Sequence, residues 1–189
     1  VEKGMTFTEV SPELAAALRE PGRRQAILDE VKQPKSGLMK TVIKDFHKLF
    51  PMSDPMDYEP GYEASVAGLA EKADVDAKAM ALDLLSEGDG TRLFFFPIVN
   101  YGDGDSESIR EMMQHPNTLM GLGDGGAHCG VICDASMPTT LLTHWGRDRT
   151  RGDRLALEWL VKRQTSDNAA YFGLQDRGRL AVGTKADIN

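Results

Sequence analysis

The chain has 189 residues, of which 41% are hydrophobic and 27% are charged, and its formal net charge is -7. This length allows one domain with a sizeable core, and the acidic balance argues against general nucleic-acid binding. No apolar run approaches the roughly 20 residues that span a bilayer, and two cysteines are too few for a disulfide framework. We therefore expect a cytoplasmic globular protein with reduced thiols and no nucleic-acid or membrane partner.

The first half of the sequence predicts helices. Ser11 is a helix N-cap, Pro12 suits the first helical position, and Glu13 places an acid in the first turn. Apolar residues then recur at helical spacing. Helices are predicted from Pro12, after Pro21-Gly22, over 38–50, over 65–73, and over 76–86 between an Asp76 cap and Gly88, with 51–60 as a breaker-rich connection.

After Gly90, predicted strands alternate with predicted helices. Apolar runs predict strands over 93–99, 119–122 and 178–182, and Pro97 places the first at an edge or a bulge. Helices are predicted over 106–114, 137–145, 153–163 and 166–172. This alternation is typical of an α/β fold, in which a parallel sheet carries crossover helices and the chemistry lies at the carboxyl ends of the strands.

Asp124 is the strongest candidate for a functional residue. It follows the predicted strand 119–122 and lies among glycines, which let a ligand approach the backbone closely. A carboxylate at the end of a buried strand is costly unless a metal, a base or a substrate compensates it. A helix N-cap before a loop is the alternative. We favour a functional site, because the polar residues Asn100, Tyr101 and Asp103 follow the preceding strand.

Several motifs between Gly123 and Arg149 resemble one family. They read Asp124-Gly-Gly-Ala-His128, Ile132-Cys-Asp-Ala-Ser136, and Leu141-Leu-Thr-His-Trp145 followed by Arg147-Asp148-Arg149. The tail adds Thr165-Ser166, Asn168-Ala169, Phe172-Gly-Leu174, Asp176-Arg-Gly178 and Ala186-Asp187. Together they resemble the D-aminoacylase (N-acyl-D-amino-acid deacylase) branch of the amidohydrolase superfamily, strongly over 115–189 and loosely over 1–90.

The resemblance implies part of a (β/α)8 barrel. Residues 1–89 would be a helical lid insertion, 90–176 the last β/α units of the barrel, and 177–189 the start of the return into a small β domain. The family holds one or two metal ions, usually zinc. Asp124 matches the aspartate after the last barrel strand, which contacts the metal-bound water or the metal and moves a proton during hydrolysis of an N-acyl-D-amino acid or a related amide.

The sequence departs from the family pattern in two places. Gly123 stands where the family usually has serine, which affects the turn more than the chemistry. No H-x-H pair occurs, and the four histidines are scattered at 47, 115, 128 and 144. A catalytic zinc needs about three protein ligands. We therefore expect a piece of a longer protein, inactive by itself, that binds less than one equivalent of zinc.

Other candidate residues have competing interpretations. His128 lies on the same loop as Asp124, which favours a side chain that faces the substrate. The alternative is a structural hydrogen bond. A group of possible zinc ligands also has two interpretations, and it consists of His128, Cys129 and Cys133. It is either a small zinc site, for which a second ligand pair is lacking, or a turn with reduced thiols. A cluster of arginines has two interpretations. It is either a solvated surface, or one of its members pairs with a substrate carboxylate. The cluster consists of Arg147, Arg149, Arg151 and Arg154.

A second hypothesis for the function is non-catalytic. The chain would be a helical lid and oligomerisation module that assembles with the missing barrel half or with another copy of itself. A truncated barrel would expose strand edges and apolar faces, and such surfaces favour oligomers.

Overall fold

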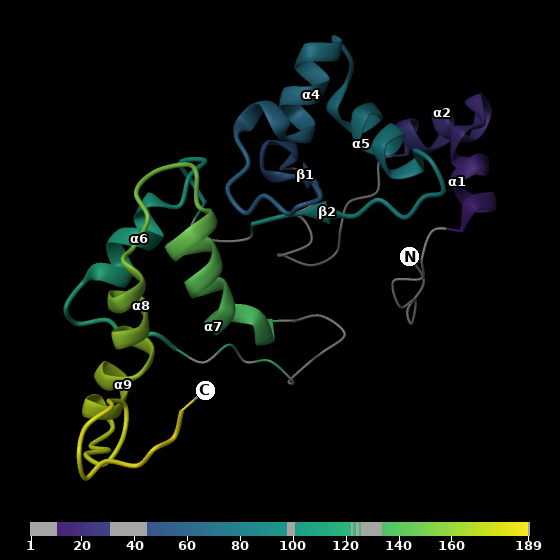
Figure 1. Cartoon of the computed structure of the whole chain (residues 1–189). Coiled ribbons are helices and arrows are strands. Elements are labelled where there is room, and N and C mark those ends of the chain that lie inside the picture. Colours follow the sequence, from purple (N-terminus) through teal and green to yellow (C-terminus); the bar gives the residue numbers. More distant parts are fainter. Residues whose placement is uncertain are drawn as a thin grey trace. The chain divides into compact units, whose positions relative to one another are not determined.

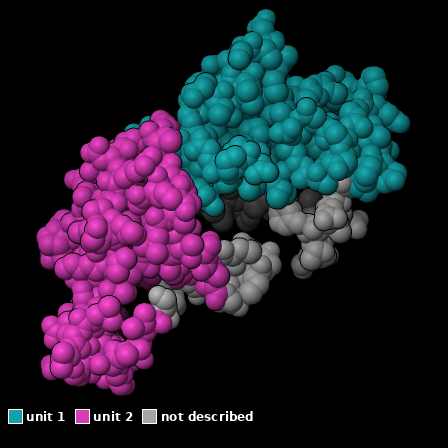
Figure 2. Space-filling view, in the orientation of Figure 1, with its two compact units in different colours: residues 1–106 teal, residues 107–189 magenta. Residues whose placement is uncertain are grey.

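A computed structural model describes residues 11–30, 45–97, 101–121, 123, 125 and 134–188. The chain divides into two compact units, residues 1–106 and 107–189, which are coloured separately in Figure 2. Each unit has its own buried residues. In the part of the chain that is described, no helix has the length and apolar character needed to cross a membrane.

Residues 1–106 form mainly short helices (Figure 1). In chain order they contain α1 (Pro12–Arg19), α2 (Pro21–Asp29), a 3-10 turn (Phe46–Lys48), β1 (Phe50–Pro51), a second 3-10 turn (Tyr62–Ala64), α4 (Val66–Ala73), α5 (Ala77–Ser86) and β2 (Phe94–Phe95). The helices predicted after Ser11, Pro21, Ser65 and Asp76 are confirmed.

Side-chain caps define where these helices begin. The Ser11 hydroxyl accepts a hydrogen bond from the Leu14 amide at 3.2 Å, and the Ser65 hydroxyl accepts one from Gly68 at 3.0 Å. The Asp76 carboxylate accepts from two amides at the start of α5, at 2.9 and 3.2 Å. Each cap satisfies amide groups that the first helical turn leaves without a partner, so capping residues in the sequence predict helix starts correctly.

Polar contacts attach α1 and α2 to α5. Arg24 makes a two-point ion pair with Asp83, with both N–O distances at 2.8 Å. The ammonium group of Lys78 donates to the carbonyl oxygens of Leu28 at 2.6 Å and Glu30 at 3.1 Å. Arg19, the last residue of α1, likewise donates to the carbonyl oxygen of Ser86, the last residue of α5. The long basic side chains thus satisfy helix-end carbonyls that have no partner within their own helix.

The described residues of the first unit contain one small sheet, in which β1 pairs antiparallel with β2 and Phe50 lies opposite Phe95. The Phe50 and Tyr101 rings are nearly perpendicular, with their centroids 6.3 Å apart. The Tyr101 hydroxyl donates to the Pro60 carbonyl at 2.8 Å. Of the strand predicted over 93–99, the described residues 93–97 form a strand over 94–95, and residues 98 and 99 lie outside the described part. In the segment predicted as a helix over 38–50, residues 46–48 form a 3-10 turn and Phe50 starts a strand, since Pro51 cannot continue a helix. Residues 38–44 lie outside the described part.

Residues 107–189 are helical (Figure 1). They contain α6 (Glu107–Gln114), a 3-10 turn (Asp134–Ser136), α7 (Met137–Thr140), a π-helical segment (Leu141–Asp148), α8 (Leu157–Gln164) and α9 (Ser166–Tyr171). The helices predicted over 106–114, 137–145 and 166–172 are confirmed. The helix predicted over 153–163 begins later, at Leu157.

Two predicted strands of this unit are absent where the structure describes them. Neither 119–121 nor 178–182 is assigned to a strand. In the second segment the Thr184 hydroxyl contacts the carbonyl oxygens of Arg179 and Ala181, and the Lys185 amide donates to the Asp176 carbonyl at 2.7 Å. Local turn contacts thus replace a strand ladder, because an apolar run becomes a strand only beside a partner strand. The partial (β/α)8 barrel stays a prediction.

The core of this unit surrounds Trp145, which is buried together with Leu141, Leu155 and Leu160. Arg149 is also buried, and its side chain is 0% exposed. Its guanidinium lies 4.7 Å from the Trp145 ring centroid. It donates to the Glu107 carboxylate at 2.6 Å and to the Asp153 carbonyl at 2.7 Å. Arg149 therefore joins α6 to the loop before α8, and its partners compensate the burial of its charge.

Replacing Arg149 by Met tests this connection. Arg149→Met retains an unbranched side chain but removes the ion pair with Glu107 and the hydrogen bond to Asp153. We expect the free energy of unfolding to fall by about 3 kcal/mol, measured by urea denaturation with tryptophan fluorescence.

The matched control is Arg147→Met. Arg147 is 71% exposed and pairs with its neighbour Asp148, so we expect no measurable change in the free energy of unfolding. Equal effects of the two substitutions would contradict the structural role of Arg149.

Candidate functional site

The candidate site is the segment that leads into and out of Asp124. Asp124 itself, predicted as the catalytic residue and as a metal ligand, lies outside the described residues, and so do His128, Cys129 and Cys133. The structure describes the backbone on both sides: residues 118–121 and Gly123 before Asp124, and Gly125 directly after it. The contacts of these flanking residues are described below.

Arg163, near the end of α8, holds the start of this segment. The side chain is 9% exposed. Its Nη2 donates to the carbonyl oxygen of Met113 at 3.2 Å, to the Thr118 hydroxyl at 3.1 Å and to the Thr118 carbonyl. Its guanidinium also lies 5.4 Å from the Trp159 ring centroid. One buried cation thus joins α8 to the turn between α6 and residue 118.

Asn168, in α9, holds the segment two residues further on. Its Nδ2 donates to the Met120 carbonyl at 3.2 Å. Met120 in turn packs its side chain against the hydrophobic cluster around Trp145. The backbone at residue 120 is therefore held by a hydrogen bond from α9, while its side chain is held by the core.

Gly125 anchors the other side of Asp124. A Cβ atom added at Gly125 would lie 2.5 Å from both the Cα and the Cβ of Ala135. Any side chain at 125 would therefore collide with the backbone at the start of the 3-10 turn Asp134–Ser136. The glycine is needed for this close approach of the chain's own backbone.

The charge around Arg163 is balanced by Asp167. The Asp167 carboxylate contacts the Lys162 ammonium and lies 3.4 Å from Nη1 of Arg163. The hydrogen bond from Lys162, followed by that from Arg163, lowers the pKa of Asp167 below its ordinary value. Asp167 thus remains an anion at neutral pH and supplies a counter-charge for the buried guanidinium.

The described histidines play local roles. The His115 Nδ1 accepts a hydrogen bond from the Asn117 amide at 3.2 Å, in the turn after α6. The His144 ring is half-buried in the π-helical segment and meets the Trp145 ring edge-on, with centroids 5.3 Å apart. His144 is therefore a packed residue. His115 lies in the turn that follows α6.

The arginine cluster separates into different environments. Arg149 is buried and forms an ion pair with Glu107, so its guanidinium is not presented to a substrate carboxylate. Arg154 donates through Nε to the Arg149 carbonyl at 2.9 Å. Arg147 is exposed and lowers the pKa of Asp148 through a hydrogen bond. The interpretation as a solvated surface therefore holds for Arg147 and is wrong for Arg149.

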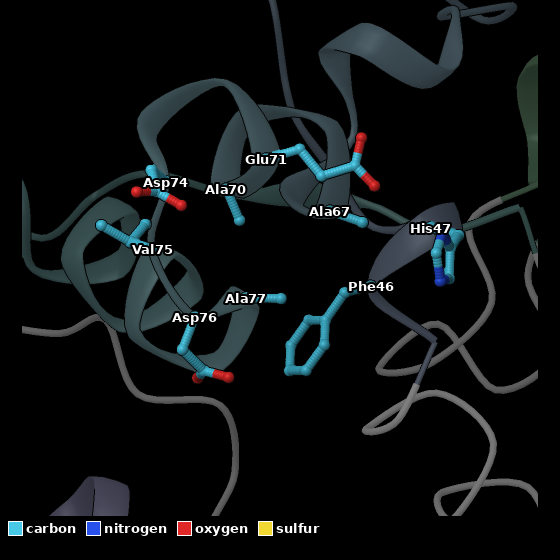
Figure 3. A pocket seen from close by; sticks show the side chains of 9 residues that line it. All are labelled: Phe46, His47, Ala67, Ala70, Glu71, Asp74, Val75, Asp76 and Ala77. Atoms are coloured by element: carbon cyan, nitrogen blue, oxygen red, sulfur yellow. The ribbon is translucent and has the colours of Figure 1, made fainter.

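The first unit contains a hollow of about 460 Å³ (Figure 3). It is lined by Phe46, His47, Ala67, Ala70, Glu71, Asp74, Val75, Asp76 and Ala77. Alanine side chains and the Phe46 ring face it, whereas the carboxylates around it point in different directions (Figure 3). Glu71 accepts a hydrogen bond from the Tyr62 hydroxyl at 2.7 Å, which raises the pKa of Tyr62. The His47 ring stacks on Tyr62 at 5.7 Å. Glu71 and His47 are thus engaged with Tyr62.

The described residues do not fit a zinc site. Across 11–30, 45–97, 101–121 and 134–188, no three histidine, cysteine, aspartate or glutamate side chains lie together so that they could hold a metal ion. A catalytic zinc normally has about three protein ligands.

The roles of Arg163 and Asn168 were not predicted from the sequence. One signal was available for Arg163: it lies three positions after Leu160, so both side chains project from the same face of α8. Leu160 is fully buried, and an arginine in register with it indicates a buried partner. For Asn168, the sequence shows its place in the tail motif but not its contact with Met120.

One comparison with known proteins identifies a family. The model of the amidohydrolase family matches residues 95–189, which include Asp124 and the segments that flank it. Searches of curated proteins and of solved structures gave no match. The resemblance to amidohydrolases seen in the sequence is thereby confirmed at the level of the family. The chain belongs to the amidohydrolase family.

Proposed function

We propose that this chain supplies the catalytic aspartate, Asp124, of a zinc-dependent hydrolase that acts on N-acyl-D-amino acids or related amides. The observation that carries the proposal is the family match over 95–189, because it spans the Asp124-Gly-Gly turn. The motifs of the D-aminoacylase branch support the narrower substrate class. The contacts of residues 118–120 and of Gly125 show that described backbone on either side of Asp124 in the sequence is held.

The proposed chemistry is hydrolysis of an amide bond. Water attacks the carbonyl carbon, and the Asp124 carboxylate accepts a proton from that water. The C–N bond then breaks, and the same proton passes from Asp124 to the leaving nitrogen, which yields a carboxylic acid and an amine. A carboxylate placed beside the reacting atoms serves both as base and as acid in this sequence. His128, on the same loop, would contact the substrate.

The metal is the second part of the proposal. Amidohydrolases are in general metal-dependent, and we propose zinc. The described residues supply no ligand cluster, and the sequence has no H-x-H pair, so we expect further polypeptide to supply ligands and the isolated chain to be inactive. In this arrangement residues 1–89 would form a helical lid, 90–176 the last units of a (β/α)8 barrel, and 177–189 the return into a small β domain, in a cytoplasmic enzyme.

Replacing Asp124 by Asn tests the catalytic role. In the enzyme that joins this chain to its metal-binding part, we expect Asp124→Asn to lower kcat for an N-acetyl-D-amino acid by about 10²- to 10⁴-fold, since the amide cannot accept the proton. The measurement is release of free amine with zinc present.

The matched control is Asp153→Asn. This carboxylate is 83% exposed and 3.3 Å from Arg110, so the same chemical change should leave kcat unaltered. An Asp124→Asn enzyme with normal kcat would refute the proposal, and so would metal-dependent hydrolysis by the 189-residue chain by itself.

A second candidate function is assembly, and one observation favours it. Several large apolar side chains between 171 and 188 are strongly exposed, namely Tyr171 (71%), Phe172 (70%), Leu180 (80%), Val182 (107%) and Ile188 (68%). Exposed apolar side chains of this size are typical of surfaces that bind another polypeptide. The chain would then act as a helical module that assembles with itself or with a barrel half.

Light scattering on the purified chain tests assembly. We expect a mass above that of one 20.7 kDa chain, and we expect the double substitution Leu180→Lys with Val182→Lys to reduce it, because charges at an apolar contact must be desolvated. Leu93→Lys is the control, since Leu93 is 66% exposed but lies in the first unit. A monodisperse monomer at micromolar concentration would contradict assembly of the chain with itself.

A further inference from the structure

Three backbone carbonyl groups before Asp124 are held by side chains from α8 and α9. Arg163 holds the carbonyls of Met113 and Thr118, and Asn168 holds that of Met120. In a sheet, such carbonyls would accept hydrogen bonds from a neighbouring strand. Residues 118–121 are not assigned to a strand in this structure. Met113 lies at the end of α6, so at Thr118 and Met120 the two side chains take the place of donors from a neighbouring strand.

Arg163 is suited to this task because its guanidinium presents several donors in a rigid plane. The side chain is buried, and burying a cation is unfavourable unless its hydrogen-bonding groups find partners. Its Nη2 finds them on Met113 and Thr118, while its Nη1 faces Asp167. Its Nε has no hydrogen-bond partner among the described residues, so the buried charge depends on the Nη contacts, and displacement of residue 118 would remove two of them.

Asn168 adds a second point of attachment. Its Nδ2 donates to Met120, while its Oδ1 is buried and has no donor among the residues that the structure describes. A buried carboxamide that contributes one hydrogen bond is costly to keep for packing alone. On its far side, α9 is itself supported, because a Cβ atom at Gly178 would lie 2.7 Å from the Cβ of Ala169.

Chain connectivity carries these attachments to Asp124. Met120 precedes Asp124 by four residues, and Gly125, which packs directly on Ala135, follows it. In the sequence, Asp124 therefore lies between two backbone positions whose contacts are described, Met120 and Gly125. Proton transfer requires a carboxylate within hydrogen-bonding distance of the reacting atoms, and a displacement of about 1 Å can cost 10²-fold in rate.

We propose that Arg163 and Asn168 are positioning residues that hold the segment 118–120 and thereby present Asp124 to the reacting amide. This role rests on the proposed hydrolase function. It assigns to both residues an effect on the chemical step rather than on substrate binding, because neither residue needs to touch the substrate.

Amide hydrogen exchange on the 189-residue chain tests the attachment without using activity. Asn168→Asp replaces the donor at Met120 by a carboxylate oxygen at nearly unchanged shape. We expect exchange of amides in 118–121 to become about tenfold faster, since one hydrogen bond and the attachment it provides are lost. Gln164→Glu is the matched control: it makes the same chemical change one turn away, where the amide donates to Pro138 at 3.3 Å.

Thr118→Val provides a second variant in case Asn168→Asp does not fold. It removes the hydroxyl that lies 3.1 Å from Arg163 and retains the side-chain shape, so we expect faster exchange in the same segment. Unchanged exchange at 118–121 in the variants that fold would overturn the proposal, whether or not the protein is a hydrolase.

Activity of the enzyme that contains this chain separates positioning from a merely structural effect. We expect Asn168→Asp to lower kcat by about 10- to 100-fold with KM changed less than about twofold, and Gln164→Glu to leave both unchanged. Faster exchange with wild-type kcat would overturn the positioning role. If the unmodified enzyme fails to hydrolyse any amide, the proposed function falls and the positioning role falls with it, while the exchange data still show whether Arg163 and Asn168 hold the segment.

Discussion

The second unit depends on buried guanidinium groups that satisfy backbone carbonyl oxygens. A short α-helix leaves carbonyls without partners at its end, and the loops between helices leave more. Arg163 supplies donors to the turn after α6, and Arg149 supplies them to the loop before α8. Each cation also lies against a tryptophan ring and near a carboxylate. Burial of these charges is tolerated because several partners surround each one.

This constraint explains why the candidate site is held from outside its own segment. Residues 118–121 contribute carbonyl groups, whereas the donors belong to helices 45 residues or more further along the chain. Packing of Met120 in the core and of Gly125 on Ala135 completes the arrangement. The described backbone before residue 122 is thus held by side chains of α8 and α9 and by the core, in place of a partner strand.

The two candidate functions draw on different surfaces of the chain. Catalysis draws on the family-matched segment around Asp124 and on its anchors in α8 and α9. Assembly draws on the exposed apolar side chains of 171–188, which follow α9 directly. An enzyme that completes its metal site with further polypeptide would use both. In the hollow of the first unit, the carboxylates point in different directions (Figure 3).

The sequence by itself determined the local and the chemical features: the helix starts at Ser11, Ser65 and Asp76, and the amidohydrolase motifs around Asp124. Capping depends on residues within one turn of each other, and a motif is a property of the residues themselves. Only the tertiary structure decided that 178–182 forms turns, because a strand requires a partner at long range. It alone separated Arg149, which is buried, from Arg147, which is exposed, and it alone revealed Asn168 beside Met120. Those differences arise from contacts between segments distant in the chain, which spacing within one segment does not encode.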